Sequence, residues 1–486
     1  MKDRREVWLV GLLNVYALGA AALHLYVRTL PATPTPLPGP GDPESRWWGL
    51  WPATYPPGWL VWLGAGVVLA AVIWGQRHVR RPVASSETPP HLPFWLLGAA
   101  ALALFGSFFL FPIVHTRWGD AYLLSRALAW PDPELRLTHS WQAPLDVFLH
   151  SQVWLHFHQV LGWGADAAPV YRLLSPLAGG LYLLAVLGLA QEDAQTPNWL
   201  TFGLLSSLGV IQLFYGYVEN YSFAAAGILG YLWLGLRTLR GKAPLWLAAL
   251  ILAVTNGLHP STVVYAPSLL YLGWRAWRRP SAHGAEGQPA WRIALTVVGP
   301  MFLVAGGVIL LMETGGHGLG ALLTDDRPGG GDGRWLVPLF TTSTRWEHYT
   351  MFSWPHLRDF LNEQMLVAPG ASPALLITAL FMGMAWLVGD KQKQALLGKD
   401  TETRFLLWAA GCHLLLTWVW NPDYGGQRDW DLFSLAAIPT ALLLARTLPR
   451  VLSRRALTPA TLPLLLLQAL HAAAWIYQNR LPWNWP

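Results

Sequence analysis

The chain contains few charged residues, which make up 12% of its 486 residues, whereas 53% of the residues are hydrophobic. A soluble globular protein carries about 25% charged residues, so this composition argues against a soluble domain. Cysteine is nearly absent too. The single one, Cys412, falls inside an apolar run, which excludes a disulfide framework and a cysteine-based metal site.

The sequence also lacks a phosphate-binding loop of the nucleotide-binding form. Its glycine-rich stretch, 329–333, is not followed by the Lys and Ser/Thr that such a loop requires. We find no internal repeat and no matched pair of Gly/Pro-broken spans, which an inverted-repeat transporter would show. We therefore expect no nucleotide cofactor. We also expect no nucleic-acid partner, because the basic residues are spread over small loops.

What the sequence does contain is long apolar runs, and a membrane-crossing helix needs ~20 such residues. The runs lie at 7–28, 58–75, 94–114, 170–190, 198–214, 221–236, 243–258, 262–274, 292–312, 373–389, 405–420, 432–446 and 457–478. A bilayer requires every backbone polar group to be satisfied internally, which favours helices. We therefore expect an all-α, polytopic membrane protein with about thirteen transmembrane helices surrounded by membrane lipids.

Lys and Arg are unevenly distributed between alternate loops. With a cytoplasmic N-terminus, the inner loops receive 21 of the 33 basic residues, including all five lysines. Cytoplasmic loops are enriched in Lys and Arg, so the sequence predicts that the N-terminus lies in the cytoplasm. The first apolar run is too long for the hydrophobic region of a signal peptide, and we expect it to be retained as a helix.

The loops divide the chain into four regions. They are 1–93, with two added helices and an extended, Pro-rich outer linker at 29–57; 94–312, the core; 313–372, an outer loop with the Gly-rich segment; and 373–486, the C-terminal helices. A first large outer loop, 115–169, lies within the core region. Its segment 142–162 has apolar residues at roughly helical spacing and predicts an amphipathic helix in the outer interface. The segment 356–366 of the second outer loop also has a helical pattern.

Ionisable groups near hydrocarbon are costly and by default mark function. The candidates, joined by two tyrosines, all fall on the predicted outer side. They are Arg117, Asp120, Tyr217, Glu219, Tyr221, His259, His356, Asp359, Arg428, Asp429 and Asp431. Their convergence on one side predicts one outward-facing cavity.

The candidates also have structural interpretations, and the functional and the structural interpretations both remain open at this point. Asp120 is also compatible with an interfacial salt bridge to Arg117. Glu219 is also compatible with the cap of a helical hairpin, and His259, before a proline, with a helix end. The three-residue spacing of His356 and Asp359, continued at Asn362, is also typical of a solvated helical face.

Four short stretches carry a resemblance to a known family: 118–122, 142–145, 171–180 and 257–262. Their order, with an acidic residue opening a large outer loop, resembles the GT-C superfamily of membrane glycosyltransferases. That superfamily includes the protein mannosyltransferases and the aminoarabinose lipid A transferases. Two departures stand out. Asp120 follows the third apolar run instead of the first, and Ala121 takes the second position of the acidic pair that many members carry.

The resemblance implies transfer of a sugar from a polyprenyl-phosphate donor to a protein, lipid or glycan acceptor on the periplasmic or extracellular face. It places Asp120 as the general base, with a metal-ligand or positioning role as alternatives, and Glu219 as a second catalytic group. Arg428 would neutralise the leaving phosphate, and a divalent metal ion near His259 is a further way to do so. The other candidates would bind substrate, with Tyr217 and Tyr221 stacking on the sugar.

Two other function classes compete with this interpretation. A secondary transporter or lipid flippase predicts ionisable residues near the middle of several spans, and the ones present lie mostly at the outer edge. A non-catalytic membrane scaffold that keeps a GT-C-like fold is the third possibility. A measurement of sugar transfer separates these classes.

Overall fold

A computed structural model describes residues 2–32, 41–80, 91–193, 196–278, 289–323, 350–387, 400–420 and 425–482. Every regular element in these ranges is a helix, which confirms the all-α prediction. The glycine-rich stretch 329–333 lies outside the described residues.

Each apolar run overlaps a helix. The helices are α1 (Lys2–Arg28), α3 (Gly58–Arg80), α4 (Phe94–Leu110), α7 (Ala168–Gln191), α8 (Asn198–Ser206), α9 (Ser222–Leu239), α10 (Leu245–Leu258), α11 (Ala266–Trp277), α12 (Ala290–Thr314), α15 (Ser372–Leu387), α17 (Thr401–Val419), α19 (Ala437–Val451) and α20 (Arg454–Asn479). Seven described helical segments are long and apolar enough to cross a membrane. The number is eight if the bent pair of α14 (Trp354–Val367) and α15 forms one span.

Large apolar side chains cover the outside of these helices. Trp8 on α1 is 70% exposed, and Phe302 and Leu303 on α12 are 74% and 72% exposed. A soluble protein rarely leaves such large apolar patches in water. The helices therefore fit an integral, multi-pass membrane protein whose outer surface contacts lipid.

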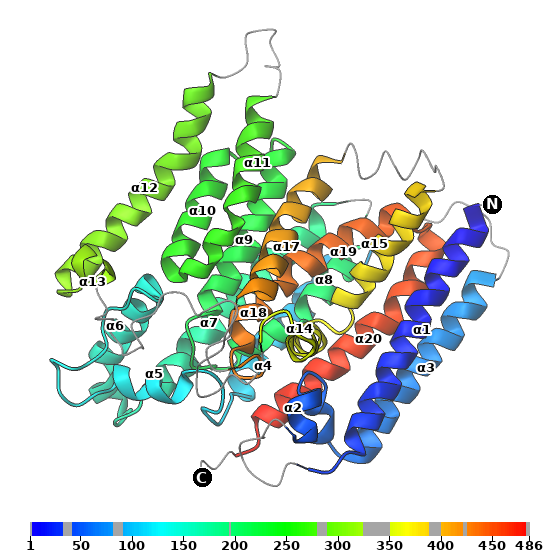
Figure 1. The fold of residues 1–486 in the computed structure, drawn as a ribbon, viewed down its shortest axis with the longest axis horizontal. Helices are drawn as coiled ribbons and strands as arrows, with labels where there is room; N and C mark the ends of the chain where they lie inside the picture. Colours follow the sequence, from blue (N-terminus) through cyan, green and yellow to red (C-terminus); the bar gives the residue numbers. More distant parts are fainter. Residues whose placement is uncertain are drawn as a thin grey trace.

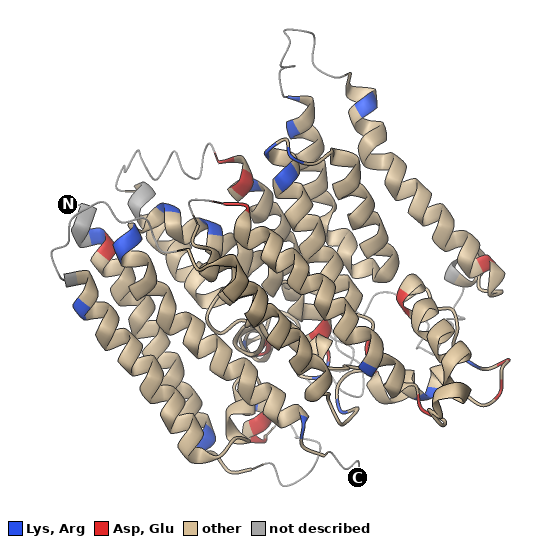
Figure 2. Cartoon of the chain, turned by 180° about the vertical axis from the view of Figure 1, so that it is seen from behind, with Lys and Arg blue, Asp and Glu red and all other residues tan. Residues whose placement is uncertain are grey.

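The long helices run side by side, so that their ends gather at two sides of the molecule (Figure 1). Helix α19 lies at the centre of the bundle and packs against α8, α9, α15 and α17. Helices α1, α3 and α20 pack together as a separate layer. Figure 2 shows that Lys and Arg occupy helix ends along the upper edge of the bundle.

Short helices gather at the lower end in the view of Figure 1. They include α2 (Pro43–Trp47), α5 (Ala121–Leu128), α6 (Pro144–Leu161) and α13 (Leu319–Leu323). Helix α6 confirms that the segment 142–162 is helical, and it ends at Gly162, whose φ of 64° stops the helix. Helix α14 likewise confirms the helical pattern of 356–366.

Three local features differ from the sequence-based expectation. The linker 29–57 was expected to be extended, but its described part contains α2 and the 3₁₀ turn η1 (Trp51–Thr54). The run 198–214 is not one helix, because α8 ends at Ser206 and the 3₁₀ turn η2 (Gly209–Phe214) follows. Helix α5 was not anticipated, because eight residues are too few to show a clear period.

Candidate functional site

The turn between α4 and α5 places Asp120 against Glu219. The backbone N–H of Asp120 donates a hydrogen bond of 2.7 Å to Oε1 of Glu219. Gly119, one residue earlier, has a φ of +48°, and a Cβ atom there would lie 2.6 Å from the same oxygen. Only glycine combines this backbone conformation with so close an approach. This geometry explains why a glycine precedes Asp120 in the stretch 118–122.

Glu219 lies in the short turn between η2 and α9, and its side chain is buried. Burial raises the pKa of the Glu219 carboxyl well above its usual range, and the Asp431 and Asp120 carboxylates raise it further. Both causes disfavour the ionised form. The surroundings of the carboxyl group that holds the Asp120 backbone therefore favour its neutral form.

Asp431 also lies next to Gly119, on the same side as Glu219. A Cβ atom on Gly119 would lie 3.5 Å from its Oδ2 atom. The hydroxyl of Tyr217 donates to the same Oδ2 at 2.9 Å, and the backbone N–H of Leu432 donates to Oδ1 at 2.8 Å. Asp431 lies in the first turn of α18 (Trp430–Ser434), which orients its buried carboxylate toward the turn at Gly119.

Helix α14 adds two more carboxylates. Asp359 accepts a hydrogen bond of 3.0 Å from the indole Nε1 of Trp48. Glu363, one turn further along the helix, is buried, and neither of its carboxylate oxygens has a hydrogen-bond partner among the described residues. Asp431, Asp359 and Asp429 interact with it electrostatically. We call Asp120, Glu219, Asp359, Glu363, Asp429 and Asp431 the acidic cluster.

Glu363 is not among the site residues predicted from the sequence. It lies four residues beyond Asp359, which itself lies three residues beyond His356, so the three residues follow a 3–4 spacing on α14. This spacing marks one helical face and was an available signal. A small cavity confirms the shared face, because all three side chains line it together with Trp420 and Phe433.

Tyr221 and His259 extend the site away from α14. Their rings lie 4.4 Å apart, and Tyr221 interacts electrostatically with Asp431 and Glu219. Burial lowers the pKa of His259 to about 4, so its imidazole is neutral near pH 7. The Nδ1 atom of His259 lies 2.8 Å from the hydroxyl of Ser261. A neutral imidazole here can exchange hydrogen bonds with a polar ligand, but it carries no charge for a phosphate.

The loop before α18 brings in Arg428 and Asp429. The backbone carbonyl of Arg428 would lie 3.5 Å from a Cβ atom on Gly119. Asp429 interacts electrostatically with both Glu219 and Glu363, so it lies between the two halves of the cluster. Gly426, in the same loop, packs against Asp359 so closely that a Cβ atom would lie 3.0 Å from its Oδ2.

Arg117 and His356 lie at the edges of this arrangement. Arg117 forms a buried ion pair with Glu44 of α2, and Glu44 also accepts a 3.1 Å hydrogen bond from Gln427. The salt bridge considered from the sequence was between Arg117 and Asp120, whereas the ion pair found here joins Arg117 to Glu44. His356 stacks on Trp418 with ring centroids 4.4 Å apart and accepts a 2.9 Å hydrogen bond from the N–H of Phe352. Both side chains support the surrounding loops.

No group of three or more His, Cys, Asp or Glu side chains in the described ranges has the geometry of a metal site. No family model matches the chain, and neither a curated protein nor a solved structure matches it. The GT-C resemblance therefore rests on the four short stretches of sequence alone, and the acidic cluster is the structural feature that indicates a function.

Proposed function

We propose that the chain is a membrane glycosyltransferase that moves a sugar from a polyprenyl-phosphate donor to an acceptor on the outer face of the membrane. The observation that carries the proposal is the hydrogen bond from the Asp120 backbone to the buried Glu219 carboxyl group, with the Asp431 carboxylate beside it at Gly119. This arrangement fixes a carboxylate at a defined position, as a general base requires. The GT-C resemblance assigns the same residue to that role.

The proposed topology has about thirteen spans, a cytoplasmic N-terminus and an outward-facing acidic cluster. Helix α9 supports it, because Glu219 precedes its first residue and Arg237 and Arg240 lie at its other end. Its 18 residues separate the two ends by about 27 Å, close to the thickness of a bilayer core. Since cytoplasmic loops are enriched in Lys and Arg, the end with Arg237 and Arg240 is the inner one.

In the proposed reaction the acceptor hydroxyl attacks the anomeric carbon of the donor sugar. Its oxygen–carbon bond forms while the bond to the phosphate oxygen breaks, and the polyprenyl phosphate leaves. Asp120 takes the hydroxyl proton, and the adjacent protonated Glu219 avoids a second negative charge beside it. Arg428 supplies positive charge for the leaving phosphate. Tyr217 and Tyr221 provide ring faces for the sugar.

The second candidate function is proton-coupled transport or lipid flipping. One observation favours it: α14 and α15 are bent by 109° at a short break, and α14 carries Asp359 and the buried Glu363. Broken helices with ionisable side chains line substrate sites in many transporters. A lipid-scrambling assay with a labelled polyprenyl-phosphate sugar in proteoliposomes, without any acceptor, separates this function from glycosyl transfer.

The test of the first proposal is sugar transfer in nanodiscs. The full chain is incubated with a panel of radiolabelled polyprenyl-phosphate sugars and crude membrane acceptors. The variants are Asp120→Asn and a matched control, Asp132→Asn, which changes an exposed carboxylate of the same loop. We expect transfer by the wild type, a loss of at least about 100-fold in Asp120→Asn and no change in the control.

Two other results decide against parts of the proposal. Transfer that survives in Asp120→Asn keeps the enzyme class and removes Asp120 as the base. Absence of transfer from every donor, with folded protein, contradicts the glycosyltransferase assignment and leaves the transport assay to decide.

A further inference from the structure

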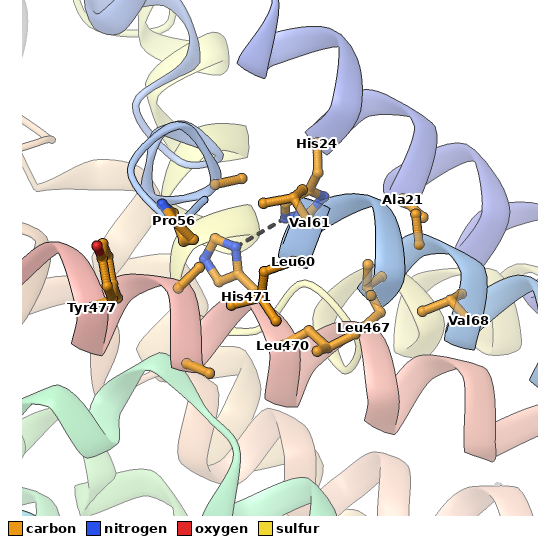
Figure 3. A pocket seen from close by; sticks show the side chains of 15 residues that line it. Ala21, His24, Pro56, Leu60, Val61, Val68, Leu467, Leu470, His471 and Tyr477 are labelled. Carbon is orange, nitrogen blue, oxygen red and sulfur yellow. Dashed lines mark hydrogen bonds between the residues drawn. The ribbon is translucent and has the colours of Figure 1, made fainter. Parts of the chain in front are cut away.

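A pocket of about 250 Å³ lies between α1, α3 and α20, away from the acidic cluster (Figure 3). Its walls are mainly apolar, with Leu60, Val61 and Val68 on α3 and Leu467 on α20. Two imidazoles interrupt this lining. Figure 3 shows His24 of α1 and His471 of α20 pointing toward one another across the pocket wall, joined by a hydrogen bond.

The two rings make three polar contacts, and both side chains are buried. The Nδ1 atom of His24 lies 2.7 Å from the carbonyl oxygen of Ala20. The Nε2 atom of His24 lies 2.9 Å from Nδ1 of His471. The Nε2 atom of His471 lies 3.1 Å from the carbonyl oxygen of Leu366. All four ring nitrogens are therefore in use.

The number of protons decides the state of the pair. A carbonyl oxygen only accepts, so the contacts to Ala20 and Leu366 each require an N–H on the imidazole. The remaining two nitrogens face one another and need a third hydrogen between them. Two neutral imidazoles carry only two N–H groups in total. All three contacts form at once only when the pair binds one further proton and becomes an imidazole–imidazolium pair.

We infer that His24 and His471 bind this additional proton and form a proton-dependent latch on the bend between α14 and α15. Without the proton, two lone pairs face one another at hydrogen-bond distance. One ring must then change its tautomer or turn away, and the carbonyl of Leu366 or of Ala20 loses its donor. The Leu366 contact is the longest of the three and joins two different helices, so it is the one that opens.

The latch acts on the helix that carries part of the acidic cluster. Leu366 lies in the last turn of α14, whose final carbonyl groups have no partner within the helix. Other contacts also secure the bend: Gln468 of α20 accepts the N–H of Ala371 at 3.0 Å, and the hydroxyl of Tyr16 donates to the carbonyl of Pro369. Opening the His471 contact releases the α14 side of the bend, and Glu363 lies one turn from it.

Few other titratable groups face the pair. Of the remaining pocket-lining residues, Tyr477 alone is titratable. Helix α3 has no charged residue between Gly58 and Gln76, and α15 has none in its length. On α1, Arg28 lies one turn beyond His24 and donates to the carbonyls of Ala53 and Thr54. On α14, the nearest acid is Glu363.

The first test is nuclear magnetic resonance of the full chain, with ¹⁵N-labelled histidine, in nanodiscs over about pH 5 to 8, where histidine titrates. We expect an imidazolium signal and a shared N–H at low pH that disappear together as the pH rises. Both signals should be missing in His24→Gln, because its amide donates to His471 Nδ1 without an extra proton. In the control His78→Gln, which changes an exposed histidine of α3, both signals should persist.

The second test is hydrogen–deuterium exchange of the peptide 354–371, corrected for the intrinsic effect of pH. In the wild type we expect protection at low pH and its loss at high pH. His24→Gln should be protected at both values, and His471→Leu, which lacks the donor to Leu366, at neither. A pair that stays neutral at low pH overturns the inference, as does wild-type protection that does not change with pH while His24→Gln and His471→Leu are both folded.

Discussion

Most carboxylates at one end of the bundle form ion pairs, whereas three buried carboxylates of the acidic cluster form none with the basic residues that the structure describes. At one end, which we call the basic end, Glu192 pairs with Arg237, Arg240 and Lys242. Arg446 pairs with Asp193, and Arg450 with Asp400 and Glu402. In the acidic cluster, by contrast, no basic side chain of the described ranges forms an ion pair with Glu219, Asp431 or Glu363.

The comparison separates stability from function. Paired charges at the basic end neutralise one another where helices α7, α9, α17 and α19 meet. Buried carboxylates without a cationic partner destabilise the fold, and proteins retain such groups chiefly at functional sites. The same residue type therefore indicates a structural role at one end and a proposed chemical role at the other.

The largest expected effect is at the basic end. Asp193→Ala leaves the fully buried guanidinium of Arg446 without its carboxylate partner. We expect the free energy of unfolding to fall by about 3 kcal/mol, because an uncompensated buried charge remains. Denaturant unfolding in detergent measures this loss. Sugar transfer per folded molecule should stay at the wild-type level. A folded but inactive variant would contradict a purely structural role for the ion pairs at the basic end.

In the acidic cluster, Glu219→Ala should lower the transfer rate by about 100-fold, the effect of misplacing a catalytic group by about 1 Å. The reason is that the Asp120 N–H loses its acceptor. Glu219→Gln keeps that acceptor in a neutral side chain and should stay within about tenfold of the wild type. Steady-state kinetics of both variants provide the measurement. Equal losses in both would show that Glu219 does more than position Asp120.

The pH dependence of the sugar-transfer rate follows from the raised pKa of Glu219. The causes of this shift are burial and then the Asp431 and Asp120 carboxylates. A raised pKa means that the carboxyl group stays neutral below that pKa and ionises as the pH rises through it. We expect the transfer rate to fall on this alkaline side, by about tenfold per pH unit for a single group. Glu219→Gln should remove the decline. A decline that is identical in the variant assigns it to another group.

Tyr217→Phe tests the support of Asp431. The change removes the hydroxyl that donates to Asp431 Oδ2 and leaves a buried acceptor with one partner fewer. We expect a loss of about 1 kcal/mol in the free energy of unfolding. Thermal unfolding checks this. The matched control is Tyr477→Phe on α20, whose side chain is 42% exposed. A loss of equal size in both variants would contradict a specific role for the Tyr217 hydroxyl.

The smallest expected effect is a gain in the free energy of unfolding instead of a loss. Glu363→Met replaces a buried carboxyl group that has no hydrogen-bond partner with an apolar side chain of similar length. We expect the protein to gain about 0.5 kcal/mol of stability, as substitutions at functional sites often do, and to lose activity. Glu402→Gln at the basic end, which breaks the contact with Arg240, should lower stability instead. A stability loss in Glu363→Met would show that this carboxyl group contributes to the fold.

The sequence predicted the helices far better than the site. Apolar runs are local, so their length and hydropathy were enough to place α1 or α20. The pairing of Asp120 with Glu219 joins residues 99 positions apart, and that of Arg117 with Glu44 joins residues 73 apart. No local pattern encodes such proximity. Pro369 and Gly370 are a turn signal between α14 and α15, but such a signal does not give the 109° angle of the bend that orients Glu363.

The central claim is that the acidic cluster transfers sugar, and the most direct test is a single-turnover reaction. Wild-type protein and Asp120→Asn in nanodiscs are mixed with the radiolabelled polyprenyl-phosphate sugar that the donor panel identifies, and acceptor labelling is followed in time. The account predicts labelling by the wild type and a rate at least about 100-fold lower in the folded variant. Equal rates in the two proteins, or donor consumption without any labelled acceptor, would contradict it.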